Sequence, residues 1–329
     1  MLEHGGKLNS VARHYGIALN DWLDLSTGIN PNGWPIPETL PRSIWSDLPQ
    51  DDDGLIKTAR DYYQCNSLLA VSGSQAAIQA LPKLRAHSKV GVMSPAYAEH
   101  AYAWKLAGHD VITLETATIS AELSKLDVLI IINPNNPTGQ KISPQQLIEW
   151  HQQLAQNDGW LIVDEAFIDV TPKNSLSQCC PKKGLIVLRS IGKFFGLAGL
   201  RTGFVLAEDT LLVQLAEYLG PWPIASASRY ITQLALADKN WQQDSRYSLA
   251  KQGQRLENLL GKHGFNKLGG CALFQWAQTK KSEQIYHQLA QQGIYTRLFA
   301  QPKSLRFGLP KTEDGWQRLS AALQELNLT

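Results

Sequence analysis

The middle of the chain alternates short apolar, β-branched runs with stretches of helical periodicity. Strands are predicted over residues 68–71, 90–94, 111–114, 128–132, 161–164, 185–189 and 203–206. Helices are predicted over 74–84, 98–107 and 144–156, the last with Ser143 as N-cap and Pro144 in the first turn. This alternation is typical of parallel βαβ units. We therefore expect an α/β fold with a central, mostly parallel sheet and helices on both faces.

A second, smaller domain is predicted after the stiff Gly-Pro-Trp-Pro segment at 220–223. A long helical stretch over about 225–260 follows that segment. Further α+β elements are then expected, namely strands over 272–276, 294–297 and 304–308 and a closing helix over 313–326. The pattern predicts an N-terminal segment (1–40) that joins the small domain and the cleft, a large ligand-binding domain (41–220) and a small α+β domain (221–329).

Composition narrows the class of protein. The 329 residues are 43% hydrophobic and 18% charged, which is ordinary for a globular protein, and the formal net charge is only +2. The chain has no run of five like charges of the kind that would suggest a nucleic-acid partner. No segment is apolar for long enough to span a membrane. The four cysteines lack metal-site or disulfide-framework spacing. We expect a cytoplasmic protein with no metal, no nucleic-acid partner and no membrane association.

Two segments after predicted strands carry side chains suited to a flat anionic ligand. Gly73, Ser74 and Gln75 stand between a strand and a helix, where backbone N–H groups and the positive helix end favour a phosphate. A glycine before an N-cap serine is equally ordinary loop chemistry. Tyr97 follows the strand over 90–94, so its ring is placed to stack on a heteroaromatic ligand or to pack in the core.

The heptapeptide Asn-Pro-Asn-Asn-Pro-Thr-Gly at 133–139 follows the apolar strand over 128–132. Open α/β sheets bind ligands at this carboxyl edge, and the side-chain amides are donors for a phenolate-like oxygen. Asp164 ends the next predicted strand and should lie at the same edge. A carboxylate there holds a pyridinium nitrogen in its protonated form, or it caps a helix.

Lys193 lies in the run Ser-Ile-Gly-Lys-Phe-Phe-Gly-Leu-Ala-Gly-Leu-Arg at 190–201. An amine that forms a Schiff base needs partly desolvated, cation-rich surroundings, because these lower the pKa of a lysine. Small and apolar residues flank Lys193, with Ser190 before it and Arg201 after it. The run fits a reactive amine, although a lone lysine beside a glycine-rich turn is more often a solvated surface residue.

In this order, and over about residues 20–325, these residues resemble the fold-type I enzymes that use pyridoxal 5′-phosphate, within the aminotransferase class I and II group. The resemblance implies that Lys193 forms the Schiff base, Asp164 pairs with the pyridine nitrogen and Tyr97 stacks on the ring. It implies that Asn136 contacts the 3′ oxygen of the cofactor. The residues that match the cofactor phosphate site are Gly73, Ser74, Gln75, Ser190 and Arg201.

The same resemblance assigns residues to a small phosphorylated amino-acid substrate. Arg306, in the segment Ser-Leu-Arg-Phe-Gly at 304–308, matches the arginine that takes the substrate α-carboxylate as a bidentate pair. Asn136, already matched to the cofactor, is also a candidate for substrate contact. The substrate phosphate needs cationic or N–H partners of its own, and the candidates are Arg297, His4 and Asn30.

Within that group the chain is similar to the branch that contains histidinol-phosphate aminotransferase and the threonine-phosphate decarboxylase of cobalamin biosynthesis. The segments at 4–6 with 23–31, at 48–55 and at 220–222 favour the decarboxylase type. Two positions depart from the aminotransferase pattern, because Phe167 and Leu48 stand where those relatives carry tyrosines. Gly192 replaces the small hydroxylated residue often found before the lysine, which removes one minor phosphate contact.

The resemblance thus implies decarboxylation of L-threonine O-3-phosphate to (R)-1-amino-2-propanol O-2-phosphate and carbon dioxide, in cobalamin biosynthesis. Lys193 would also return a proton to Cα. One alternative is a phosphate-ester aminotransferase of the histidinol-phosphate type, because the same residues serve when the Cα–H bond is perpendicular to the ring. A non-catalytic protein that binds pyridoxal phosphate is another. The resemblance also implies a homodimer.

Overall fold

The computed structural model describes residues 5–326. Contacts divide the chain into two compact units. The large unit comprises Gly33–Asn136 and Lys141–Gln243, and the small unit comprises Met1–Asn32, Pro137–Gln140 and Asp244–Thr329. Residues 33–40 and 221–243 therefore group with the large unit, although the sequence pattern had placed them in the N-terminal segment and the second domain.

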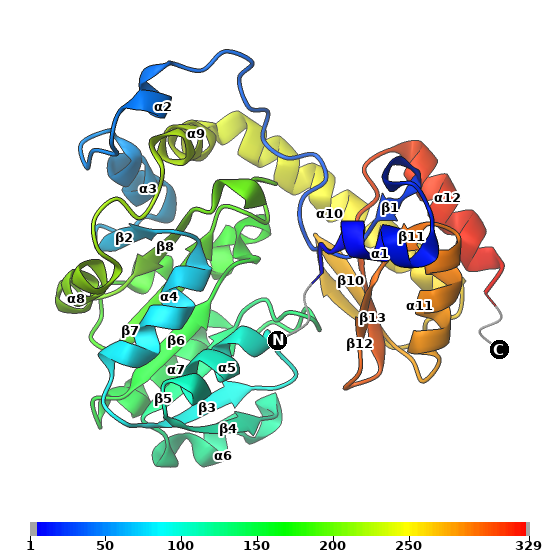
Figure 1. Ribbon diagram of the computed structural model, residues 1–329. Helices are drawn as coiled ribbons and strands as arrows, with labels where there is room; N and C mark the ends of the chain where they lie inside the picture. The colour runs from blue at the N-terminus through cyan, green and yellow to red at the C-terminus, as the bar shows by residue number, and fades with distance from the viewer. Residues whose placement is uncertain (1–4, 327–329) are drawn as a thin grey trace. The chain divides into compact units, whose positions relative to one another are not determined.

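A seven-stranded sheet forms the centre of the large unit, with strand order β2-β8-β7-β6-β5-β3-β4 (Figure 1). The strands are β2 (Leu68–Val71), β3 (Lys89–Met93), β4 (Asp110–Leu114), β5 (Val128–Ile132), β6 (Trp160–Asp164), β7 (Leu185–Ser190) and β8 (Gly203–Leu206). Only β8 pairs antiparallel with its neighbours, β2 and β7. The predicted fold class is confirmed, and all seven predicted strands form within one residue of their expected bounds.

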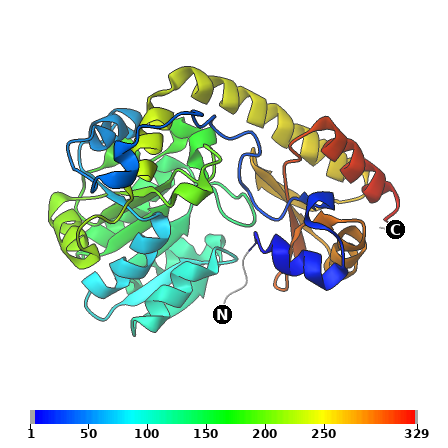
Figure 2. The ribbon, with the colours of Figure 1, turned by 45° about the horizontal axis from the view of Figure 1, so that its top comes forward.

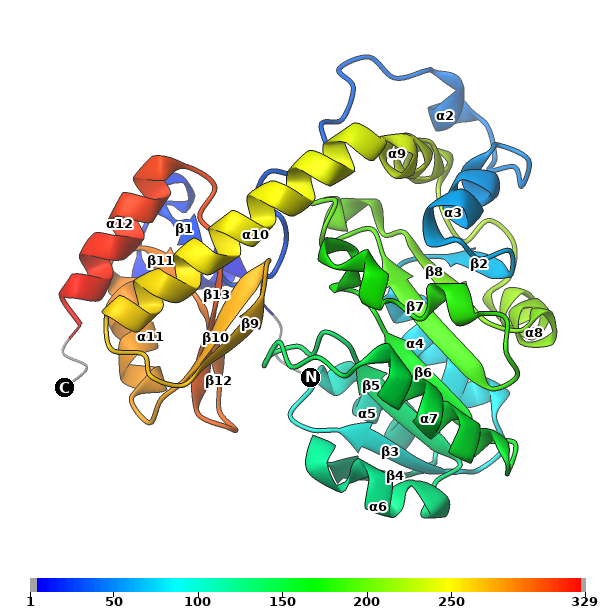
Figure 3. The same cartoon turned by 180° about the vertical axis from the view of Figure 1, so that it is seen from behind.

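The helices of the large unit cover both faces of its sheet. They are α2 (Ser43–Ser46), α3 (Leu55–Tyr63), α4 (Ser74–Ala80), α5 (Ala98–Leu106), α6 (Ile119–Glu122), α7 (Pro144–Ala155), α8 (Asp209–Leu219) and α9 (Ser226–Ala237). One hydrophobic cluster joins α4, α5 and α8 to alternate residues of the strands, including Ile162 and Leu188. Helix α7 lies on the opposite face (Figure 3). The central strands β5, β6 and β7 are buried on both sides, which explains their largely apolar sequences.

The small unit is α+β. Its sheet has the order β12-β13-β10-β9, and β1 pairs in parallel with β11 in a separate two-stranded sheet. The strands are β1 (Leu23–Asp24), β9 (Leu268–Cys271), β10 (Phe274–Gln278), β11 (Ile294–Tyr295), β12 (Arg297–Phe299) and β13 (Ser304–Gly308). Its helices are α1 (Leu8–Tyr15), α11 (Ser282–Gln291) and α12 (Glu313–Gln324), with most of α10 (Lys239–Lys262). Figure 2 shows α12 beside α10, where Arg255 pairs with Glu313.

Several elements differ from the sequence prediction. The strand expected over 294–297 is two short strands in different sheets, β11 and β12. The expected helix over 225–260 is two helices, α9 and α10, separated at Asp238. Strand β9 was not predicted, because glycines lower strand propensity and it contains Gly269 and Gly270. A Cβ on Gly269 would lie 2.4 Å from the Thr138 carbonyl oxygen, so close packing requires the glycine. Helix α1 was not predicted either, although Leu8, Val11, Ala12 and Tyr15 follow the helical period. Within residues 5–326, no helix has the length and apolarity needed to cross a membrane.

Candidate active site

Polar side chains collect where the parallel strands of the large unit end. Asp164 is the last residue of β6, and its register partners are Ile132 on β5 and Leu188 on β7. Asn133 follows β5 directly, and Ser190 is the last residue of β7. Because parallel strands end at the same edge of a sheet, these segments converge as the sequence predicts.

The Asp164 carboxylate is buried, with only 3% of the residue exposed. The His100 Nε2 atom on α5 lies 2.9 Å from Asp164 Oδ2, and the backbone N–H of Ala166 donates to Oδ1. The His100 ring also makes an edge-to-face contact with Tyr97. Sequence reasoning missed His100, although its spacing of three residues from Tyr97 was the available signal. A buried carboxylate with a histidine behind it suits the partner of a cationic ring nitrogen.

Tyr97 lies immediately before α5 and is half-buried. Its hydroxyl donates to Gln75 Oε1 at 3.2 Å, and Gln75 Nε2 donates to Glu99 Oε2 at 2.9 Å. Burial, followed by the nearby carboxylate of Glu99, raises the pKa of Tyr97 to about 12. The phenol therefore stays neutral at physiological pH and presents a ring fixed by its hydroxyl.

The start of α4 forms a narrow cradle with Arg201. Gly73 has φ = 71°, and a Cβ there would lie 2.7 Å from Arg201 Nη2. A Cβ on Gly203 would lie 2.6 Å from the backbone nitrogen of Ser74. Both glycines thus let a guanidinium and a neighbouring strand approach the free N–H groups at this helix end. Such a set of donors fits a phosphate group.

Lys193 is half-buried in the turn after β7. Its Nζ atom lies 5.6 Å from the centroid of the Phe167 ring, a cation–π distance. The next residues, Phe194 and Phe195, are fully buried and pack on Trp241. The amine therefore projects from a rigid apolar turn rather than from a solvated surface loop.

Two asparagines of the heptapeptide at 133–139 hold loops in place. Asn133 exchanges two hydrogen bonds with the backbone of Ile142, and Asn135 Nδ2 donates to the Pro95 carbonyl at 2.8 Å. The second contact ties this segment to the loop that carries Tyr97. Asn136 is half-buried, and it is the residue that the resemblance assigns to the 3′ oxygen.

Arg306 and Arg297 are cross-strand partners on β13 and β12 of the small unit, so their side chains share one face of that sheet. Arg306 is 7% exposed, and its Nη2 donates to the Ser26 carbonyl at 2.8 Å. Burial, with a contribution from Arg297, lowers the pKa of Arg306 to about 10, which still leaves it charged at neutral pH. A pair of neighbouring cations favours an anionic ligand.

The other predicted substrate residues lie at the N-terminal end. Asn30 is buried, and its Oδ1 accepts a hydrogen bond from the backbone of Asn32 at 2.9 Å. His4 lies outside the described residues.

Gly192, the departure before the lysine, donates its N–H to Ser190 Oγ. A Cβ at that glycine would lie 3.1 Å from Ala198 Cα, so the turn leaves little room for a larger residue.

Comparisons with known proteins place this geometry in a family. The family model for aminotransferase class I and II matches residues 50–328. The chain belongs to the aminotransferase class I and II family. A threonine-phosphate decarboxylase from Pseudomonas aeruginosa is 52% identical to this member of the family over 323 residues, which cover 98% of this chain and 97% of that protein. A Sinorhizobium protein of the same name is 37% identical, and the match covers 99% of this chain and 98% of that protein.

Solved structures of the family share the fold. Histidinol-phosphate aminotransferase from Sinorhizobium meliloti in complex with pyridoxal-5′-phosphate matches with a TM-score of 0.80 at 18% identity. The match covers 98% of this chain and 95% of that one. The resemblance inferred from the sequence, to the aminotransferase class I and II group and within it most of all to threonine-phosphate decarboxylase, is confirmed.

Proposed function

We propose that this family member is a pyridoxal-phosphate-dependent decarboxylase that converts L-threonine O-3-phosphate to (R)-1-amino-2-propanol O-2-phosphate and carbon dioxide, in cobalamin biosynthesis. The observation that carries the proposal is the 52% identity to a threonine-phosphate decarboxylase over nearly the whole chain. The arginine pair in the small unit supports it, because the substrate carries both a carboxylate and a phosphate. A ligand with two anionic groups matches two cations on one sheet face.

The residues of the large unit fit the cofactor. The cradle of Gly73, Ser74 and Arg201 would hold its phosphate, with Gln75 and Ser190 at the edge. Tyr97 would stack on the ring, Asp164 would pair with its nitrogen, and Asn136 would donate to its 3′ oxygen. When bound, the pyridinium ring supplies an electron sink for the bond that breaks at the substrate Cα.

Lys193 and Arg306 are assigned the remaining roles, proton transfer and binding of the substrate carboxylate. Lys193 would hold the cofactor through its amine and would donate a proton to the substrate Cα. Its half-buried position beside Phe167 limits solvation, which favours both roles. Arg306 holds the substrate carboxylate through paired N–H donors, and its bond to the Ser26 carbonyl fixes the direction of the guanidinium.

The substrate phosphate is assigned to Arg297, with Asn30 and His4. Arg297 lines a cavity of about 240 Å³ in the small unit, together with Lys7, Ser10 and Thr296. Lysine, arginine and hydroxyl donors are the partners that a dianion needs when it leaves water. The cavity therefore supports Arg297 as a phosphate ligand.

The decisive experiment incubates the protein with pyridoxal phosphate and L-threonine O-3-phosphate, with and without a keto-acid acceptor, and measures carbon dioxide. We expect release that does not depend on the acceptor. Keto-product formation without carbon dioxide would instead support an aminotransferase. Lys193→Ala serves as the control, and it should lose both turnover and the covalent cofactor band. An unchanged band in that variant would contradict the assignment of Lys193.

We also propose that this enzyme forms a homodimer and acts in the cytoplasm. The exposed fractions of Trp45 and Leu48 in the large unit are 67% and 63%, and a patch of exposed apolar side chains often marks an association surface. No disulfide joins the cysteines of residues 5–326, which suits a reducing compartment. Sedimentation of the wild type and of Trp45→Glu tests the dimer, since a charge in the interface should shift the variant toward monomer. A monomeric wild type would refute it.

A further inference from the structure

The ends of β6 and β7 present different chemistry on the two faces of the large sheet. Asp164, Leu188 and Ser190 share one face with α4 and α5, as the contact of His100 with Asp164 shows. Side chains alternate along a strand, so Glu165 and Arg189 point to the opposite face. Each is adjacent in sequence to a residue assigned to the cofactor.

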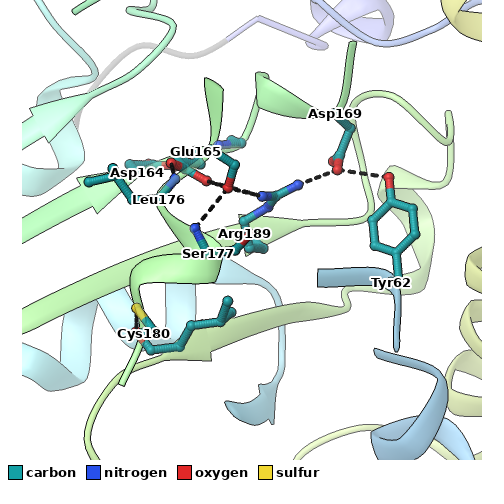
Figure 4. Close-up of polar contacts among 11 residues, drawn as sticks. Tyr62, Asp164, Glu165, Asp169, Leu176, Ser177, Cys180 and Arg189 are labelled. Atoms are coloured by element: carbon teal, nitrogen blue, oxygen red, sulfur yellow. Dashed lines mark hydrogen bonds and ion pairs between the residues drawn. The ribbon is translucent and has the colours of Figure 1, made fainter. Parts of the chain in front are cut away.

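Arg189 is the centre of a buried ionic cluster on that opposite face (Figure 4). It is 2% exposed, and its Nη1 lies 3.0 Å from Glu165 Oε2 and 2.8 Å from Ser175 Oγ. Its Nη2 pairs with Asp169 Oδ1. The Tyr63 ring lies 4.6 Å from the Arg189 Cζ atom, so one guanidinium is held in a plane by four side chains.

A contribution to folding stability does not by itself explain this cluster. Two carboxylates, both fully buried, surround one guanidinium, and burial raises the pKa of Glu165 despite the neighbouring Arg189. The cost of desolvating buried charges often equals or exceeds their mutual attraction. What such a cluster does provide is a fixed geometry for the segments that it joins.

Those segments reach Lys193 from two sides. Phe167 lies between Glu165 and Asp169 in the chain, and its ring faces the Lys193 amine at 5.6 Å. On the other side, the Tyr62 hydroxyl donates to Asp169 Oδ1 at 2.9 Å. The Tyr62 ring contacts Phe195 edge-to-face at 5.7 Å, two residues after Lys193. Asp169 thus links both supports of the lysine.

We propose that Arg189, with Glu165 and Asp169, forms a positioning cluster that sets where the Lys193 amine lies, through Phe167 on one side and through Tyr62 and Phe195 on the other. The proposal rests on Lys193 as the cofactor lysine. The cluster lies on the face of the sheet opposite Asp164, so its residues act on Lys193 through the apolar supports. Loss of the cluster displaces the amine rather than removing a chemical group from the reaction.

Two variants test the cluster at different severity. Arg189→Lys keeps the charge but loses the planar fork that joins both carboxylates. Tyr62→Phe removes one donor to Asp169 and keeps the ring against Phe195. The matched control is Arg229→Lys, because Arg229 is also buried, at 5% exposed, and makes a bidentate pair with Asp53, remote in sequence from the lysine turn.

The measurements are the melting temperature of the cofactor-free protein, the pH titration of the absorbance of Lys193-bound cofactor, and kcat with KM. We expect Arg189→Lys to shift the titration by about half a pH unit and to lower kcat by roughly 10- to 100-fold with little change in KM. Tyr62→Phe should shift the titration in the same direction by less. Arg229→Lys should lower the melting temperature and leave titration and kcat unchanged.

Equal melting losses in Arg189→Lys and Arg229→Lys, with both titrations unchanged, would show that the cluster is structural and would overturn the proposal. The proposal would also be overturned if Tyr62→Phe titrates at the same pH as the wild type and Arg189→Lys only unfolds. Failure of the site assignment is separate, since it appears as a cofactor band that survives Lys193→Ala.

Discussion

Phe167→Tyr tests the position at which this chain departs from its aminotransferase relatives. The phenylalanine is 3% exposed and faces the Lys193 amine, so an added hydroxyl enters a site with almost no solvent. A hydrogen bond to a charged acceptor stabilises by about 1.5–3 kcal/mol, and one pH unit corresponds to about 1.4 kcal/mol. If the hydroxyl donates to the ionised 3′ oxygen, the titration of the bound cofactor should move downward by about 1–2 pH units.

Without cofactor the same hydroxyl is buried and lacks that acceptor, which should cost about 1–3 kcal/mol of unfolding free energy. Absorbance titration of the loaded protein and urea unfolding of the cofactor-free protein measure the two effects. Phe167→Leu is the control, because it removes the ring from Lys193 and adds no donor. A Phe167→Tyr titration that coincides with wild type would refute this account of position 167.

Four further outcomes follow from the geometry. Gly73→Ala should weaken cofactor binding by at least roughly tenfold by equilibrium titration, because φ is 71° and the new Cβ would displace Arg201. Trp104→Ala should lower the unfolding free energy by about 3–5 kcal/mol in urea, because the ring is 1% exposed in the large core. Ser143→Ala should lower it by about 1 kcal/mol, because Ser143 Oγ caps α7 through the Gln146 N–H. The Lys183 ammonium lowers the pKa of Asp158. The pair therefore contributes to folding stability at pH values above the usual pKa of an aspartate, and this contribution is lost as the pH falls through the lowered pKa. Wild type and Asp158→Asn should therefore differ in unfolding at neutral pH and converge in acid.

Much of the candidate site could be predicted from local sequence. Asp164 and Lys193 follow apolar runs that must be strands, so their place at one edge of a parallel sheet follows from strand direction. The roles of Asn133 and Asn135 could not be predicted, because their partners, Ile142 and Pro95, lie in other loops. The pattern also missed His100, whose contact with Asp164 joins residues 64 positions apart.

The strand and helix pattern, the order of the motifs and the family were determined by the sequence itself, because period, turn residues and strand direction are local properties. The division of the units and the second face of the sheet were decided only by tertiary structure. Arg189 shows the difference. In sequence it is one charge at the end of an apolar strand, and the fold places it between Glu165 and Asp169. Burial makes such a pairing necessary, but only the packed chain specifies the partner.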